Sequence, residues 1–127
     1  MSLIVNIAKH IAASTAWIMD VSLFVGGDIL ASPATCVVVR EVPGSNENWS
    51  GLQERAIQIV CQGLDYVTTE DSAEAIFTLF KHKAGFSGVN LVGEGILYCD
   101  AMLRPTLMDR DERGSFIFAM SFVMRKS

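Results

Sequence analysis

Two stretches of the chain carry apolar residues at the three- and four-residue spacing of an amphipathic helix. The first runs from residue 2 to about residue 14, and Ser2 is expected to cap it. The second opens with an acidic turn in which Thr69 is the expected N-cap, and Gly85 is expected to end it. Its apolar stripe consists of Ala73, Ile76, Phe77 and Phe80. The pattern therefore predicts two helices, each with one face available to a core.

Shorter segments have the composition and alternation of strands. Residues 21–25 form a short apolar run before a glycine-containing turn. Residues 35–42 are rich in β-branched types, and Cys36 and Val38 are expected on their buried face. Residues 53–63 alternate apolar and polar side chains. Because a short polar loop joins these last two segments, we expect them to pair antiparallel.

The last third of the chain has the outline of a long hairpin, with strands over residues 95–108 and 115–125 and a charged tip over 109–114. The second strand alternates most clearly, since its bulky side chains all point one way: Phe116, Phe118, Met120, Phe122 and Met124. A helix is expected to pack on that face. The predicted class is α+β, a mainly antiparallel β-sheet with two helices packed on one face and a long C-terminal β-hairpin, in one domain over residues 1–127.

The composition of the chain is rich in apolar residues and poor in charged ones. Half of the 127 residues are apolar and 19% are charged, against about a quarter charged in ordinary soluble domains. No apolar run approaches the roughly 20 residues of a membrane-spanning helix, and no basic segment precedes the first apolar stretch, so neither a membrane association nor a secretory signal is expected. The surplus indicates contact with partner subunits, for which the candidates are Val37, Val39, Val60, Trp49 and the reverse face of the last strand.

Charge and cysteine content exclude further classes. The net charge of −4 argues against a module that binds duplex nucleic acid, which would need a basic face. Cys36, Cys61 and Cys99 lie far apart without a CxxC spacing, so we interpret them as reduced core thiols.

No motif for catalysis is present in the sequence, and no catalytic residue, cofactor site or metal ligand is assigned. His10 and His82 are expected on solvated helix positions. The segment Gly88 to Gly95 contains three glycines but follows a helix instead of joining a strand to one. We therefore interpret it as a mobile or interface loop and not as a phosphate cradle.

Two polar segments are candidates for contact with other chains. The loop over residues 43–51 contains Asn46 and Glu47 and one aromatic residue, Trp49, which either covers the edge of the core or contacts another chain. The hairpin tip mixes both signs of charge in Asp109, Arg110, Asp111, Glu112 and Arg113. A solvated turn, a protein docking element and a metal site remain alternatives for the tip, although it lacks the glycine and the terminal glutamate of a calcium loop.

The order of elements over residues 3 to 86 resembles a known family, the tail terminator proteins of long-tailed bacteriophages, also called tail completion or minor capsid proteins. The features that carry the resemblance are the run Leu23 to Gly27, then Ser32-Pro33, a β-rich segment ending at Arg40 to Gly44, a strand through Gln58, and an acid-opened helix with Ala73 and Ala75.

The resemblance implies a structural, non-enzymatic protein of the virion, assembled in the host cytoplasm without a cofactor. Such subunits form a ring, hexameric in the family, on the head-proximal end of the tail tube. The ring stops tube polymerisation and offers a surface to the head-tail connector protein. DNA passes through it without specific binding, so we expect a neutral or acidic bore.

Under this interpretation, the loop around Trp49 and the tip from Asp109 to Arg113 would contact neighbouring subunits or the tail tube protein. Two alternatives remain open from the sequence. One is another neck component, a head completion or stopper protein, and the other is a small ferredoxin-like ligand-binding domain or enzyme.

Overall fold

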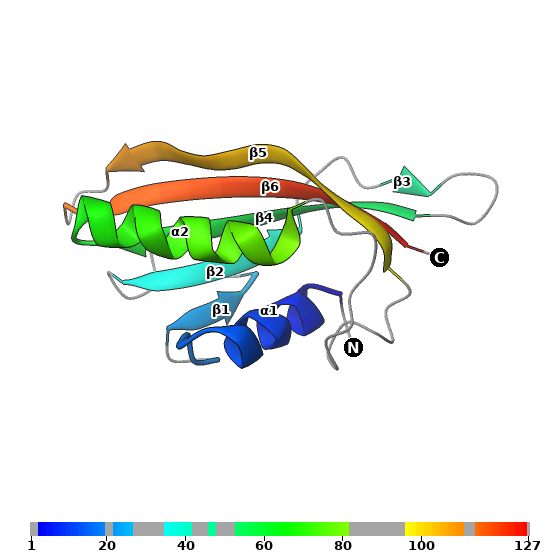
Figure 1. The fold of residues 1–127 in the computed structure, drawn as a ribbon, viewed down its shortest axis with the longest axis horizontal. Coiled ribbons are helices and arrows are strands. Elements are labelled where there is room, and N and C mark those ends of the chain that lie inside the picture. Colours follow the sequence, from blue (N-terminus) through cyan, green and yellow to red (C-terminus); the bar gives the residue numbers. More distant parts are fainter. Residues whose placement is uncertain are drawn as a thin grey trace.

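A computed structural model describes residues 3–19, 22–26, 35–41, 46–47, 53–81, 96–110 and 114–126 of the chain. Its elements, in order, are α1 (Leu3–Ser14), β1 (Leu23–Val25), β2 (Cys36–Glu41), β3 (Asn46–Glu47), β4 (Gln53–Gly63), α2 (Tyr66–Phe80), β5 (Ile96–Arg110) and β6 (Phe116–Lys126). Figure 1 shows two helices against a long sheet that ends in the β5–β6 hairpin. The predicted α+β class is therefore confirmed.

The sheet has the order β1-β2-β4-β6-β5, and the short β3 pairs with β4. The predicted antiparallel pairing of β2 with β4 is confirmed, and β6 lies between β4 and β5. One pair departs from the mainly antiparallel arrangement, because β1 runs parallel to β2. Two backbone hydrogen bonds fix this direction, from the Val37 N–H to the Ser22 carbonyl and from the Gly26 N–H to the Val39 carbonyl.

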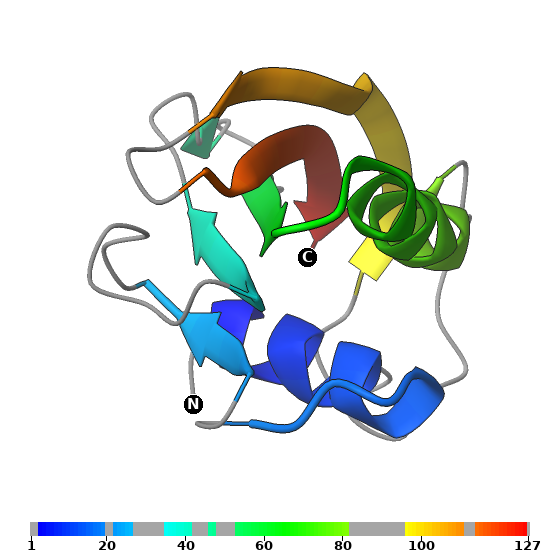
Figure 2. The same cartoon turned by 90° about the vertical axis from the view of Figure 1, so that its left-hand side faces the viewer.

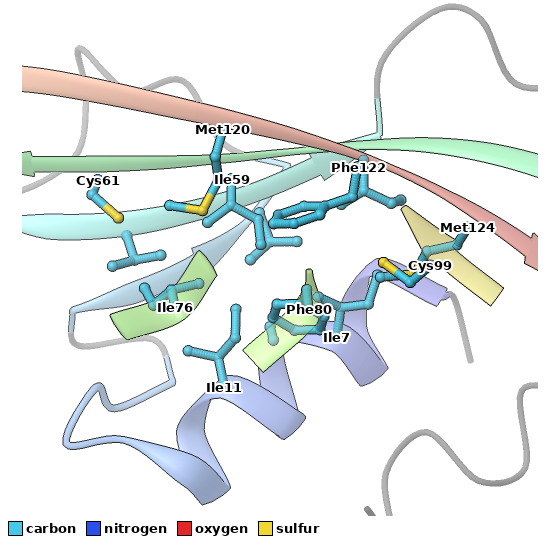
Figure 3. Close-up of a cluster of buried hydrophobic side chains, with 14 of the residues drawn as sticks. Ile7, Ile11, Ile59, Cys61, Ile76, Phe80, Cys99, Met120, Phe122 and Met124 are labelled. Carbon is cyan, nitrogen blue, oxygen red and sulfur yellow. The ribbon is translucent and has the colours of Figure 1, made fainter. Parts of the chain in front are cut away.

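Both helices cover the same face of the sheet, which curves around them in Figure 2. The predicted stripe of α2 and the bulky face of β6 meet in the middle of this layer. The rings of Phe77 and Phe80 each lie 5.6 Å from the ring of Phe122. Figure 3 shows Phe80 and Phe122 together with Ile7 and Ile11 of α1, which belong to the same cluster. The core prediction for these two elements is confirmed.

The prediction for β2 is wrong in part. Val37 and Val39 belong to the core beneath the helices, whereas Cys36 and Val38 are buried on the other face. Val60 on β4 is also buried. A strand that is buried on both faces has a continuous apolar sequence without alternation, so periodicity gave no way to tell which face is inward. These valines are therefore not available for contact with other chains.

The ends of α2 also differ from the prediction, because the helix begins three residues before Thr69. Asp65 is the N-cap, and its carboxylate accepts hydrogen bonds from the N–H and the hydroxyl of Thr68. The hydroxyl of Thr69 donates to the Asp65 carbonyl from inside the helix. At the other end, the helix stops at Phe80 with Lys81 as its C-cap. The expected caps Ser2 and Gly85 lie outside the described residues.

All three cysteines are free and buried, which confirms their interpretation as core thiols. Burial raises the pKa of the Cys61 thiol to about 12, and the nearby Cys36 adds to the increase. Burial also raises the pKa of Cys99 to about 12, with a further contribution from the charge of Asp100.

We therefore expect Cys61 and Cys99 to resist a thiol reagent such as DTNB in the folded protein at pH 8 and to react in urea. The folded thiols keep protons that an unfolded thiol loses above its pKa of about 8.5, so this contribution to stability is complete below that pH and decreases as the pH rises toward 12. The urea midpoint should accordingly fall between pH 8 and pH 10. Rapid labelling of the native protein, at a rate above that of global unfolding, would contradict this prediction.

Candidate assembly surfaces

The described part of the chain contains no group of three or more metal-ligating side chains and no helix that could cross a membrane. His10 is half-buried, and its ring makes an edge contact with the Phe80 ring at 5.6 Å, so it is only partly solvated. His82 and the segment Gly88 to Gly95 lie outside the described residues.

The first predicted contact segment is anchored at one end of the sheet. The backbones of Asn46 and Glu47 form β3 and pair with Glu54 and Gln53 at the beginning of β4. Trp49 lies outside the described residues. The start of β4 pairs in turn with the end of β6 near Arg125. β3 therefore lies near the C-terminal end of the last strand.

The second predicted contact segment lies at the other end of the same strand. Asp109 and Arg110 were expected in the hairpin tip, but their backbones continue β5 and pair with Ile117 and Phe116 at the beginning of β6. The tip is shorter than predicted, and Asp111, Glu112 and Arg113 lie outside the described residues. Since β6 has 11 residues at about 3.3 Å each, the two segments are roughly 30 Å apart. The structure therefore does not bring them together.

A third surface, which the sequence did not single out, is the edge strand β5. Met102 is 67% exposed and Met108 is 57% exposed, and three more large apolar side chains on this strand are at least one third exposed: Tyr98, Leu103 and Leu107. The ladder to β6 shifts register at four places along β5, and Pro105 lies within one of the shifts. The apolar run Met102-Leu103 beside an arginine and a proline was the available signal, but strand prediction treated it as part of a regular hairpin.

One end of β5 borders a groove of about 250 Å³ on the face of the sheet away from the helices. Its lining combines apolar side chains with charged ones: Tyr98, Met102, Val123, Glu54, Asp100 and Arg125. Arg125 and Glu54 are 3.5 Å apart across it. The groove is thus a mixed surface around the most exposed apolar residue of β5.

A second hollow, of about 230 Å³, lies where β4 ends and α2 begins. Trp17, Gly63, Leu64 and several hydroxyl-bearing residues line it, and Leu64, just before α2, is about 60% exposed. The hydrogen bonds from Thr68 hold the pKa of the Asp65 carboxyl below its usual value, so this rim is negatively charged at neutral pH. The hollow therefore combines the apolar side chains of Trp17 and Leu64 with hydroxyl groups and one acidic side chain.

The chain matches a protein family over most of its length. A family profile described as bacteriophage tail terminator protein matches residues 14–127, which include every strand of the sheet and α2. No curated protein matches the chain significantly. The match extends the resemblance seen in residues 3 to 86 through the C-terminal hairpin. The chain belongs to the bacteriophage tail terminator family, a family of structural virion proteins.

Proposed function

We propose that this protein forms a ring on the head-proximal end of the tail tube, where it stops tube polymerisation and offers a joining surface to the head. The observation that carries the proposal is the family match over residues 14–127. A ring subunit needs two different surfaces for its two neighbours, because a head-to-tail contact joins unlike patches. The exposed apolar residues of β5 and the hollow at the start of α2 are two surfaces of different kinds, which is consistent with such a contact.

The placement of the polar segments supports distinct axial contacts as well. A terminator must present one end to the tube and another to the head connector. β3, which precedes Trp49 in the chain, and Arg110, which precedes the tip, lie at opposite ends of β6, roughly 30 Å apart at about 3.3 Å per residue. We propose that these segments contact the tube or neighbouring subunits. The net charge of −4 also suits a bore through which DNA passes without being held.

The proposal is tested by deleting the gene from the phage and complementing it with wild-type or variant copies. Without the protein, electron microscopy should show tubes longer than those of the normal phage and no infectious particles. Trp49→Ala and Arg110→Glu should each reduce infectious titre at least tenfold, since they remove an aromatic anchor and reverse a contact charge. Tubes of normal length that fail only to join heads would instead assign the protein to head completion or to a stopper.

A further inference from the structure

We infer that the start of α2 and the end of β5 together form a docking surface for a basic segment of a different virion protein. This α2–β5 surface consists of Tyr66, Val67, Leu107 and Met108 and of the acidic side of α2 that follows them. The inference rests on the proposed function in one respect, because a subunit that stops a tube and joins a head must dock on proteins other than itself.

Four large apolar side chains adjoin at one end of the molecule. Leu107 on β5 pairs with Phe118 on β6, and the Phe118 ring lies 5.3 Å from the ring of Tyr66. Val67 follows Tyr66 on α2, and Met108 follows Leu107 on β5. The four side chains of the α2–β5 surface are between 41% and 61% exposed. Apolar residues that gather in one exposed patch mark an interaction site, whereas single ones scattered over a surface do not.

An acidic stripe extends this surface along α2. Glu70, Asp71 and Glu74 follow Val67 at spacings of three, four and seven residues, which places them on the same side of the helix. Asp71 is exposed, and the two glutamates are half-buried. The other side of α2 lines the hollow beside the end of β4, so the stripe lies on the side toward β5, the edge strand. The apolar patch and the stripe are therefore continuous.

The charge of α2 decides the kind of partner. Of the 14 acidic and 10 basic residues of the chain, four acidic and no basic ones lie between Asp65 and Phe80, so the other 111 residues carry ten of each. The whole net charge of −4 is thus carried by α2 and its N-cap. Arg104 on β5 offsets one of these charges, and an acidic excess remains. Such a surface repels nucleic acid and favours a protein segment in which large apolar side chains stand beside lysines or arginines.

A second copy of this chain offers little basic surface to the stripe. Arg40 donates a hydrogen bond to a glutamine on the neighbouring strand, and Arg55 and Arg125 are each paired with a glutamate. Lys81 lies 6.0 Å above the Phe77 ring. Each of these basic side chains would have to leave a contact within its own subunit to reach a carboxylate of another. Within the part of the chain that the structure describes, the charges therefore favour a different protein as the occupant.

The end of β5 is suited to contact through side chains and not to the addition of another strand. Pro105 lies within a register shift and has no N–H to donate, and a second shift separates Leu107 from Asp109. Proline and bulges are devices by which natural edge strands avoid sheet extension. We therefore expect the partner segment to lie across the apolar side chains and along the acidic stripe.

The experiment places the photo-crosslinking amino acid p-benzoylphenylalanine at Val67 or at Leu107 in a copy of the protein that complements the deletion phage. Purified virions are irradiated, and the crosslinked peptides are identified by mass spectrometry. Both sites should crosslink to the same segment of one other virion protein, with more lysine and arginine than acidic residues. Ala13 is the control site, because it is exposed on α1, which packs beside β1 and β2 at the opposite edge of the sheet (Figure 1). It should not crosslink to that segment.

A charge reversal tests the acidic stripe. Asp71→Lys should lower the crosslink yield from Val67 at least fivefold, because it places a positive charge opposite a basic partner. Asp100→Lys is the matched control, since it changes the net charge by the same amount in the groove on the face of the sheet away from the helices. It should leave the yield unchanged.

Crosslinks from both sites to another copy of this chain, or to a segment without basic residues, would overturn the inference and leave the proposed function intact. An unchanged yield with Asp71→Lys would do the same. So would the absence of crosslinks at both sites in virions that contain the protein, because the surface would then stay in solvent. If the protein is absent from virions and tubes have normal length without it, the inference and the proposed function both fail.

Discussion

Replacing Phe122 with alanine is expected to lower the free energy of unfolding by about 3 to 5 kcal/mol. Phe122 is fully buried on β6, an interior strand between β4 and β5. Its ring lies 5.6 Å from the rings of Phe77 and Phe80, so it packs α2 against the sheet. Figure 3 shows the Phe80 side of this contact. The cavity left by alanine opens between two layers that are fixed by their own backbone hydrogen bonds and can collapse only in part.

This loss is large against the roughly 5 to 15 kcal/mol by which ordinary domains are stable. Urea unfolding followed by circular dichroism at 222 nm would measure it. Phe77→Ala is the matched control, because Phe77 belongs to the same aromatic group but is only half-buried. We expect Phe77→Ala to lower the free energy of unfolding by less than half as much as Phe122→Ala does. A difference below about 1 kcal/mol between Phe122→Ala and wild type would show that the core does not depend on this ring.

Much of the layer arrangement could be predicted because alternation and helical spacing report directly on which face is buried. β6 places Phe118, Met120 and Phe122 under the helices, as its alternation predicts. The β4 boundaries, Gln53–Gly63, also coincide with the alternating segment. In each case one face of the element contacts the core and the other has different side chains, so the sequence contains the signal.

The inward face of β2 and the start of α2 could not be predicted from the periodicity of apolar residues. The run from Cys36 to Val39 is apolar on both faces, and nothing in it distinguishes Val37 from Val38. The start of α2 was placed late because both Asp65 and Thr69 are good capping residues, and only the hydrogen bonds of Thr68 decide between them. Helix boundaries thus follow from competition among caps and not from the apolar stripe.

The candidate surfaces were the least predictable part of the molecule. The charged tip and the loop around Trp49 were chosen for composition, and the structure places their anchors at opposite ends of β6. The apolar edge of β5 was missed because Met102 and Leu103 are adjacent, and alternation assigns one of two neighbours to the interior. Register shifts on both sides of Leu103 leave both of them at least one third exposed. Irregularity of an edge strand is a tertiary property, and it exposes residues that a regular strand would bury.

A second large effect is expected at Gly63, where β4 ends beside α2. A Cβ atom at this position would lie 2.2 Å from the Thr69 hydroxyl oxygen. That hydroxyl is held in place because it donates a 2.6 Å hydrogen bond to the Asp65 carbonyl in the first turn of the helix. Gly63→Ala should therefore cost about 1 to 3 kcal/mol of stability by forcing the strand and helix apart, and Gly63→Val should cost more.

The cause of this loss can be separated from the general cost of replacing a glycine. Thr69→Ala removes the obstructing oxygen and leaves the next atom at 3.4 Å, an ordinary contact, so the double variant should be more stable than the sum of the two single effects predicts. Gly26→Ala is the matched control: its φ of +67° strains an alanine by about 1 to 2 kcal/mol, but nothing lies within 4 Å of the added Cβ. Thr69→Ala cannot rescue that strain. Urea midpoints would be measured for the three single variants and for Thr69→Ala combined with each glycine variant. They distinguish a steric clash at the start of α2 from backbone strain. Strict additivity of the effects at Gly63 and Thr69 would show that the helix and strand do not meet there as described.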